Sequence, residues 1–145
     1  MANYAESASS GVWDTQSAVY TDVPNLKVSI ATQGGPVLLQ LVATPTSGEP
    51  NGHIGCEAAA GVATFCFFRF TRDGTPLPSM EIGVSVKTAG QGATVSLPCS
   101  ALSMIDKPPV GNHVYTLQAR SANAAVPGGP HTTEIEGAKL VAIAF

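Results

Sequence analysis

Short runs of β-branched, aromatic and aliphatic residues, separated by Gly, Pro, Asn and Asp, recur along the whole of this sequence. Such runs are typical of β-strands joined by tight turns. No segment keeps the apolar spacing that an amphipathic helix needs. The pattern therefore predicts an all-β chain with almost no helix, folded as a two-sheet antiparallel sandwich. The length of 145 residues fits a single domain over residues 1–145, with residues 1–15 as an N-terminal arm.

About eight strands are expected from this punctuation. Their predicted positions are Ala18–Asp22, Leu26–Thr32, Val37–Ala43, Gly61–Arg72, Met80–Thr88, Ala93–Leu97, His113–Ser121 and Lys139–Phe145. Pro24-Asn25 is predicted to form a turn between the first two strands, and Gln33–Pro36 to close a hairpin between the next two. The polar stretch Thr44–Gly61 is predicted to be a surface loop with at most one short strand.

Two predicted strands are apolar on both faces. In Gly61–Arg72, one face carries a cysteine and two phenylalanines, and the other carries Phe65, Phe67 and Arg69. The last strand, Lys139–Phe145, has no polar face at all. A strand with one solvated face normally alternates apolar and polar residues. Charged residues make up only 12% of the chain, about half the usual share. We therefore expect a covering loop or a neighbouring subunit on these second faces, and expect the chain to oligomerise.

The charge pattern argues against two classes of partner. A net charge of −3 and seven scattered Lys and Arg residues give no basic face, so we predict no binding to nucleic acid. No stretch reaches the roughly 20 apolar residues that span a bilayer, so we predict no membrane insertion. Residues Met1 to Gly11 lack the basic and apolar regions of a signal peptide. Either the chain is mature as written or it leaves the cell by another route, and we expect it to act outside the cell or on a virion surface.

The cysteines allow three interpretations. Cys56, Cys66 and Cys99 make an odd count, which argues against a disulfide framework. Buried reduced thiols are the interpretation we favour, because all three lie in apolar settings. A Cys56–Cys66 bridge is the first alternative. A metal site with His53 is the second, although the His53-x-x-Cys56 spacing brings together only two of the ligands that zinc requires.

No arrangement typical of an active site is present. The serines lack a Gly-x-Ser-x-Gly elbow, and His113 and His131 have no paired spacing. No glycine-rich loop precedes a helix, so nucleotide binding is not indicated. Glu134 and Glu136 would share one face of an extended segment, where a solvated edge is a simpler interpretation than an acid–base pair. We predict that the chain is not an enzyme and uses no cofactor or metal.

A carbohydrate site needs an aromatic platform for the C–H face of a sugar and planar polar groups for its hydroxyls. The candidates are Trp13, Tyr20, Tyr115, Arg69, Arg72 and Arg120. Trp13, in the polar N-terminal segment, is either a lid over a neighbouring subunit or a ligand platform. Arg69 follows the second-face phenylalanines, which suits an inter-subunit salt bridge or a ligand clamp. Asp73, in the Asp73-Gly74 sequence, is most simply a turn former.

Three passages resemble a known family. Residues 18–26, Ala-Val-Tyr-Thr-Asp-Val-Pro-Asn-Leu, resemble the first strand and turn of the TNF-like fucose-binding lectin domain of a Burkholderia superlectin. Residues 109–119 resemble the penultimate strand of C1q-like and phage-associated jelly rolls, and Lys139–Phe145 is similar to their central final strand. The resemblance to TNF-like and C1q-like proteins implies a jelly roll that assembles as a homotrimer about its C-terminal strands. The chain departs from ordinary C1q-type proteins because it has no collagen-like stalk.

These observations lead to three functional hypotheses. The first is a lectin-like homotrimeric module that binds cell-surface glycans, fucosylated ones included, at sites near subunit boundaries. The second is a structural or receptor-contact protein of a phage or virion appendage, or a self-assembling coat. The third is a TNF/C1q-like protein ligand.

Overall fold

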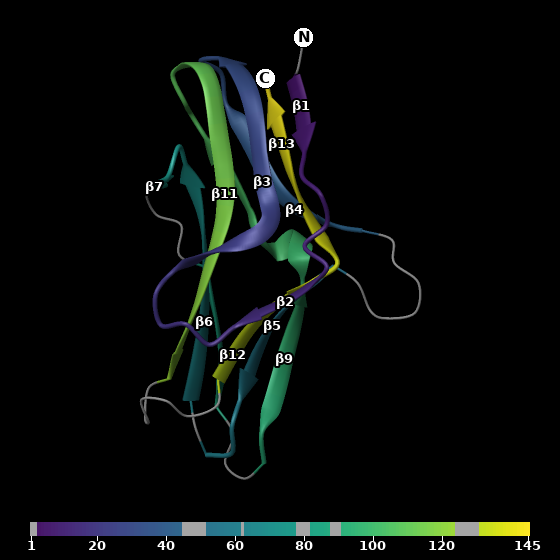
Figure 1. Ribbon diagram of the computed structural model, residues 1–145, viewed down its shortest axis with the longest axis vertical. Coiled ribbons are helices and arrows are strands. Elements are labelled where there is room, and N and C mark those ends of the chain that lie inside the picture. The colour runs from purple at the N-terminus through teal and green to yellow at the C-terminus, as the bar shows by residue number, and fades with distance from the viewer. Residues whose placement is uncertain (1–2, 45–51, 62, 78–81, 88–90, 124–130) are drawn as a thin grey trace.

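The chain folds into an elongated antiparallel β-sandwich, drawn in Figure 1 from a computed structural model. The structure describes residues 3–44, 52–61, 63–77, 82–87, 91–123 and 131–145. Among them, the only helical element is a short 3-10 turn, Cys99–Ala101. The two termini lie together at one end of the molecule (Figure 1), where the first described strand pairs with the last. The predicted all-β antiparallel sandwich is confirmed.

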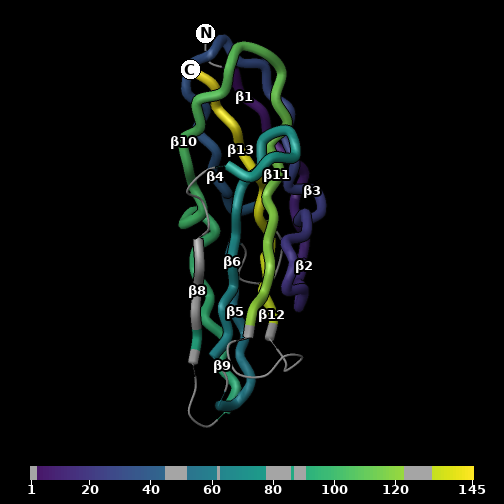
Figure 2. The backbone as a smooth tube through the Cα atoms, turned by 90° about the vertical axis from the view of Figure 1, so that its left-hand side faces the viewer, coloured from purple at the N-terminus to yellow at the C-terminus, as the bar shows by residue number. Residues whose placement is uncertain are grey.

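One layer is a sheet of long strands, called here the front sheet. Its order is β3 (Thr21–Gln33), β11 (Val110–Asn123) and β6 (Ala63–Arg72). β7 (Thr75–Pro76) and β8 (Ile82–Lys87) pair with successive parts of the outer edge of β6. Figure 2 shows β6 and β11 running side by side along the length of the molecule.

The second layer consists of two four-stranded sheets placed end to end. The upper sheet has the order β1 (Asn3–Glu6), β13 (Ala138–Ala144), β4 (Val37–Ala43) and β10 (Ser103–Asp106). The lower sheet has the order β2 (Val12–Thr15), β12 (His131–Glu136), β5 (His53–Ala58) and β9 (Ala93–Pro98). At each of the four positions, the chain continues from one sheet into the other. β12 passes into β13 through Gly137, whose φ of 56° suits glycine, so the two sheets are halves of one layer that bends at its middle.

The core lies between the layers and follows the two-residue period of the strands. Val37, Leu39 and Leu41 of β4 are fully buried on the side of the second layer. Alternate residues of β6 and β11 are buried on the side of the front sheet. In β6 the inward residues are Cys66, Phe68 and Phe70, as the alternation predicted. Each buried Leu or Phe side chain contributes about 1.5–3 kcal/mol relative to exposure.

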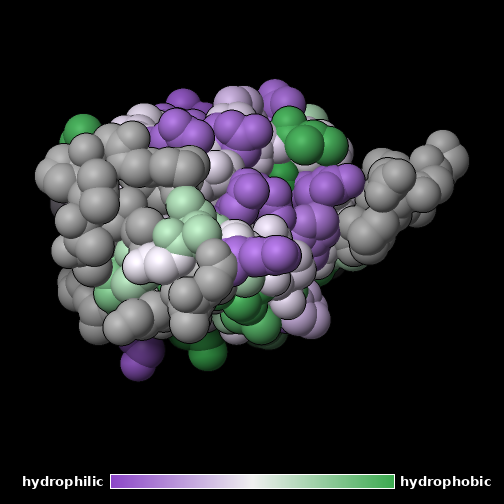
Figure 3. All heavy atoms as spheres, turned by 90° about the horizontal axis from the view of Figure 1, so that it is seen from below, coloured by the Kyte–Doolittle hydropathy of each residue, from purple (hydrophilic) through white to green (hydrophobic). Residues whose placement is uncertain are grey.

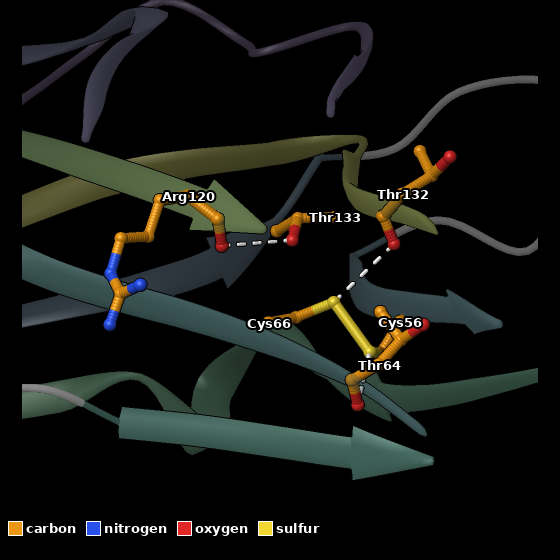
Figure 4. The surroundings of a disulfide bond; sticks show 6 residues. All are labelled: Cys56, Thr64, Cys66, Arg120, Thr132 and Thr133. Atoms are coloured by element: carbon orange, nitrogen blue, oxygen red, sulfur yellow. Dashed lines mark hydrogen bonds between the residues drawn. A yellow bond between two sulfur atoms is a disulfide. The ribbon is translucent and has the colours of Figure 1, made fainter. Parts of the chain in front are cut away.

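A disulfide between Cys56 of β5 and Cys66 of β6 joins the lower sheet to the front sheet (Figure 4). The Cα atoms of the pair are 5.7 Å apart, within the range that a bridge requires. The favoured prediction of reduced thiols is therefore wrong for these two residues, because facing strands of two layers bring them together. It holds for Cys99, which is free and buried, and burial raises the pKa of its thiol. The alternative of a metal site at His53 and Cys56 fails because the bridged sulfur is not a thiolate.

Two predicted turns take other forms. Pro24-Asn25 lies inside β3, where the pairing with β11 shifts register and Asn25 has a φ of 66°. Asn tolerates this left-handed conformation, so the dipeptide forms an irregularity within one strand instead of a turn between two. Gln33–Pro36 joins β3 to β4, but these strands lie in different layers and do not pair. The predicted hairpin is wrong, because each strand buries its apolar face against the opposite layer.

Several strands were not expected from the sequence. β1 and β2 lie within the predicted N-terminal arm. β5, by contrast, is the one short strand that the prediction allowed within Thr44–Gly61. Residues 45–51 of that loop lie outside the described residues, as do Met80, Glu81 and Thr88 of the predicted strand Met80–Thr88. β7, β10 and β12 are the other unexpected strands.

Candidate functional site

Aromatic and planar polar side chains gather on the outer face of the front sheet. We call this group the outer-face cluster, and its members are Tyr20, Asp22, Phe67, Arg69, Gln118 and Arg120. Three of the six sequence-predicted candidates, Tyr20, Arg69 and Arg120, belong to it.

The register of β6 and β11 sets the positions of four members. Arg69 pairs with Gln118, and Phe67 pairs with Arg120 in the next row of the same face. All four are half-buried, whereas the residues that alternate with them along both strands are fully buried in the core. Strand alternation therefore turns these side chains outward and leaves them accessible.

Tyr20 reaches the cluster because the segment before β3 crosses over the end of β11. The backbone N–H of Ser121 donates a hydrogen bond to the carbonyl oxygen of Ser17, at 2.8 Å. Thr21 then pairs with Ala119 as β3 begins. These backbone contacts hold Tyr20, the residue before β3, over the outer face.

Both cluster arginines stack on aromatic rings. The guanidinium carbon of Arg69 lies 3.8 Å from the centroid of the Tyr20 ring, and that of Arg120 lies 5.2 Å from the same centroid. Arg120 also lies 4.1 Å from the Phe67 ring centroid. The Phe65 and Phe67 rings stack on each other, with centroids 6.3 Å apart. Stacking engages the faces of the guanidinium groups, while their N–H donors lie in the plane of each group.

A chain of hydrogen bonds fixes the polar side of the cluster. Nε of Arg69 donates to Oε1 of Gln118 at 2.8 Å, and Nε2 of Gln118 donates to Oδ1 of Asp22 at 2.7 Å. Each planar group thereby holds its neighbour in one orientation. Gln118 and Asp22 were not among the predicted candidates, because only the pairing of β11 with β6 and β3 places them beside Arg69.

Arg72 and Tyr115 lie elsewhere, in a network around Asp106. Nη1 of Arg72 and the hydroxyl of Tyr115 both donate to Oδ2 of Asp106, at 2.7 and 2.8 Å. Tyr115 is fully buried. Burial is the main cause of the raised pKa of its phenol, and the hydrogen bond to Asp106 raises this pKa further. Arg72 borders a hollow of about 170 Å³ beside Leu77. Its ion pair with Asp106 connects the front sheet to the upper sheet.

Trp13, the sixth candidate, lies on β2 in the second layer. It pairs with Ile135 of β12 and packs, half-buried, against the core. β2 lies within the predicted N-terminal arm, so its pairing with β12 was not expected from the sequence. Trp13 does not join the outer-face cluster.

The predicted carboxylate pair lies on the lower sheet. Oε1 of Glu134 and Oε2 of Glu136 lie 3.5 and 3.7 Å from Nε2 of His53, so the two carboxylates share one face of β12, as their spacing predicted. Within the described ranges, no group of His, Cys, Asp and Glu residues is arranged to hold a metal ion.

A second histidine–carboxylate pair joins β11 to the turn after β6. Nδ1 of His113 lies 2.7 Å from Oδ2 of Asp73, and its Nε2 lies 3.0 Å from the carbonyl oxygen of Pro109. Both ring nitrogens thus face acceptors, which favours the doubly protonated ring. The hydrogen bond that His113 donates to the Asp73 carboxylate raises the pKa of His113, and the same bond lowers the pKa of Asp73. Asp73 has a φ of 52°, consistent with its predicted place in a turn.

A larger hollow of about 360 Å³ lies at the end where β5 stops and β6 begins, lined by Gln16, Glu57, Thr132 and small residues. Figure 3 shows this end of the molecule, where hydrophilic residues gather near the centre of the visible face. None of the described lining residues is aromatic. The outer-face cluster therefore has the better chemistry for a sugar ring.

Comparison with known proteins identifies no family. No family model matches the chain, and no curated protein matches it. A chain from the structure of the infectious bursal disease virus Gx strain aligns with 98% of this chain and 32% of its own length, at 8% identity and a TM-score of 0.40. The present chain thus spans about a third of that viral chain. A likeness of this degree carries no argument about function.

The described residues include no helix long and apolar enough to cross a bilayer.

Proposed function

We propose that the sandwich is a jelly roll. β1 and β2 pair with β13 and β12, and β3 pairs with β11. β4 and β5 pair with β10 and β9, and β6 pairs with β7 and β8. Early segments thus pair with late ones and middle segments with each other, as in a long antiparallel hairpin rolled into two layers. Jelly rolls occur among both lectin domains and viral capsid proteins, so this fold is compatible with binding and with assembly.

We propose that the chain binds carbohydrate at the outer-face cluster. The observation that supports this function is the convergence of Tyr20 and Phe67 with Arg69, Gln118 and Asp22 on one accessible sheet face. Aromatic rings offer apolar surface to the C–H face of a sugar, and the planar groups offer donors and acceptors to its hydroxyls. The hydrogen-bonded order of these groups reduces the entropy lost on binding.

The experiment that tests this function is a glycan array probed with the wild type and with Tyr20→Ala. Tyr4→Ala is the matched control, because Tyr4 is a 60% exposed tyrosine of the upper sheet. We expect glycan binding by the wild type, its loss in Tyr20→Ala and its retention in Tyr4→Ala, with circular dichroism confirming that each variant is folded. A folded wild type that binds no glycan, or binding that survives Tyr20→Ala, would reject the proposed site.

A second candidate function, a self-assembling coat or appendage protein, is favoured by the outer face of the upper sheet. Tyr4, Ile143, Leu38 and Ile105 are paired in one row that crosses all four strands. Tyr4 and Ile105 are exposed by 60% and 64%. Lys139 and Glu6 lie beside this row and form an ion pair at 3.3 Å, so each of these two charges is compensated by the other. Such a face suits contact with other copies of the chain. We propose that the resulting assembly is a homotrimer.

Sedimentation velocity tests the assembly. We expect Ile105→Glu to dissociate the oligomer, because it places a charge within an apolar contact. Val110→Glu is the matched control, since Val110 is similarly exposed, at 69%, but lies on the front sheet. A monomeric wild type, or an oligomer unaffected by Ile105→Glu, would reject self-association through this face.

A further inference from the structure

Arg69 differs in its partners from Arg72 and Lys139. Arg72 pairs with Asp106 at 2.7 Å, and Lys139 pairs with Glu6 at 3.3 Å. Arg69 instead directs its Nε at the neutral amide of Gln118 and its face at the Tyr20 ring. In the described part of the chain, no carboxylate forms an ion pair with Arg69. The nearest acidic member of the cluster, Asp22, binds the far end of Gln118.

The remaining donors of Arg69 suit a planar anion. With Nε and one face of the guanidinium engaged, Nη1 and Nη2 are the nitrogens for which the described residues provide no hydrogen-bond partner. Together they form a fork that matches the two oxygens of a carboxylate or of a sulfate. The bond to Gln118 and the stack on Tyr20 hold this fork in place before a ligand arrives, so little side-chain entropy is lost on binding.

Arg120 is the second guanidinium group of the cluster, and it shares the Tyr20 ring with Arg69. Arg120 is the diagonal neighbour of Arg69 across β11 and β6, a relation that separates residues by about 7–8 Å. Its guanidinium lies over both Tyr20 and Phe67. A sugar ring seated on the aromatic surface would therefore have Arg69 within reach of a substituent at its edge.

We infer that the outer-face cluster selects glycans that carry an anionic group, either the carboxylate of a sugar acid or a sulfate ester, and that Arg69 binds this group. The inference rests on the proposed carbohydrate-binding function. Hydrogen bonds between charged groups are roughly twice as strong as those between neutral groups. An acidic glycan is therefore expected to bind about tenfold more tightly than its neutral counterpart, a difference equivalent to about 1.4 kcal/mol.

The test uses an array of matched sets, in which each neutral oligosaccharide is printed beside its sialylated, glucuronylated and sulfated derivatives. The best set is then titrated calorimetrically with the wild type, Arg69→Gln and Lys107→Gln. Lys107 is an exposed lysine that follows β10 and serves as the control for loss of one positive charge. We expect the ratio of acidic to neutral affinity to fall to about one in Arg69→Gln and to keep its wild-type value in Lys107→Gln.

A salt titration of the wild type provides a readout that does not depend on the folding of a variant. The ratio of acidic to neutral affinity should fall as ionic strength rises, because salt screens exposed charges. Equal affinity across the matched sets would overturn anion selection while leaving carbohydrate binding intact. An acidic preference unchanged in folded Arg69→Gln would overturn the role of Arg69. Absence of binding to every glycan, neutral or acidic, would reject the proposed function itself. Preference for carboxylate over sulfate, or the reverse, identifies the class of anion.

Discussion

Replacing Tyr115 with Phe removes one hydrogen bond from a buried network and changes little else. The Tyr115 side chain is fully buried, and its hydroxyl donates to Oδ2 of Asp106 at 2.8 Å. The same oxygen accepts a second hydrogen bond from Arg72 at 2.7 Å. Phe preserves the ring and its packing, so no ring-sized cavity forms. Asp106 loses one of these two donors and keeps the cationic one.

The expected cost follows from the charge of the acceptor. A hydrogen bond to a charged group contributes about 1.5–3 kcal/mol. Because Arg72 still compensates the carboxylate, we expect Tyr115→Phe to lower the free energy of unfolding by about 1.5–2 kcal/mol, near the bottom of that range. For a chain of this size, the loss corresponds to a decrease in Tm of about 3–8 °C. Urea unfolding followed by circular dichroism measures the free energy, and a thermal scan measures Tm.

Tyr4→Phe is the matched control, because Tyr4 also donates its hydroxyl to a carboxylate, Glu6, at 2.6 Å, but on the surface. Solvent competes for that hydroxyl, so no measurable loss of stability is expected. Wild-type stability in Tyr115→Phe would refute the proposed contribution of the Asp106 network.

Three further predictions address the disulfide, the buried histidine and the C-terminal strand. Alkylation of the denatured protein should label one cysteine before reduction and three after it, and three labels before reduction would exclude the bridge. Reduction should lower the free energy of unfolding by about 3 kcal/mol, given the ten-residue separation of Cys56 and Cys66. The raised pKa of His113 implies that its stabilising effect is present below its ordinary value of 6.5 and is lost as pH rises through the raised pKa. The lowered pKa of Asp73 implies an effect present above 3.8 and lost as pH falls through the lowered pKa. Urea unfolding from pH 5 to 9 should therefore show a decline in the wild type that is absent in His113→Gln; parallel curves would contradict the pairing. Deleting Ile143–Phe145 should dissociate or unfold the protein, because it removes strand pairs with both β1 and β4. An unchanged oligomer in sedimentation velocity would show that these pairs are not needed for folding or assembly.

The sequence predicted long strands better than it predicted their partners. β6 and β11 were expected at nearly their observed positions, because their alternation continues over many residues. β1, β2 and β10 have only four residues each, too few for a clear pattern. Pairing could not be derived from turn chemistry, because the connection at Gln33–Pro36 passes between layers. Whether such a turn closes a hairpin or crosses the sandwich depends on burial of the strands that follow.

The site was predicted in the same partial way. Residue chemistry identified Tyr20, Arg69 and Arg120, since aromatic and guanidinium groups are suited to sugar recognition. It also selected Arg72 and Tyr115, although the structure places both beside Asp106. The sequence shows which side chains have the required chemistry, but not which of them lie on the same face of the folded protein. That distinction depends on register, as does the placement of Gln118 beside Arg69.

The arrangement of β6 explains how one strand can serve both stability and recognition. Its inward residues, Cys66, Phe68 and Phe70, carry the disulfide and part of the core. Its outward residues, Phe67 and Arg69, belong to the outer-face cluster. Figure 4 shows the same separation on β11, where the Arg120 side chain extends away from the disulfide while its carbonyl oxygen accepts a hydrogen bond from Thr133 at 3.0 Å. Because backbone pairing within the front sheet fixes these strands, substitutions on the outer face are expected to change ligand affinity far more than the free energy of unfolding.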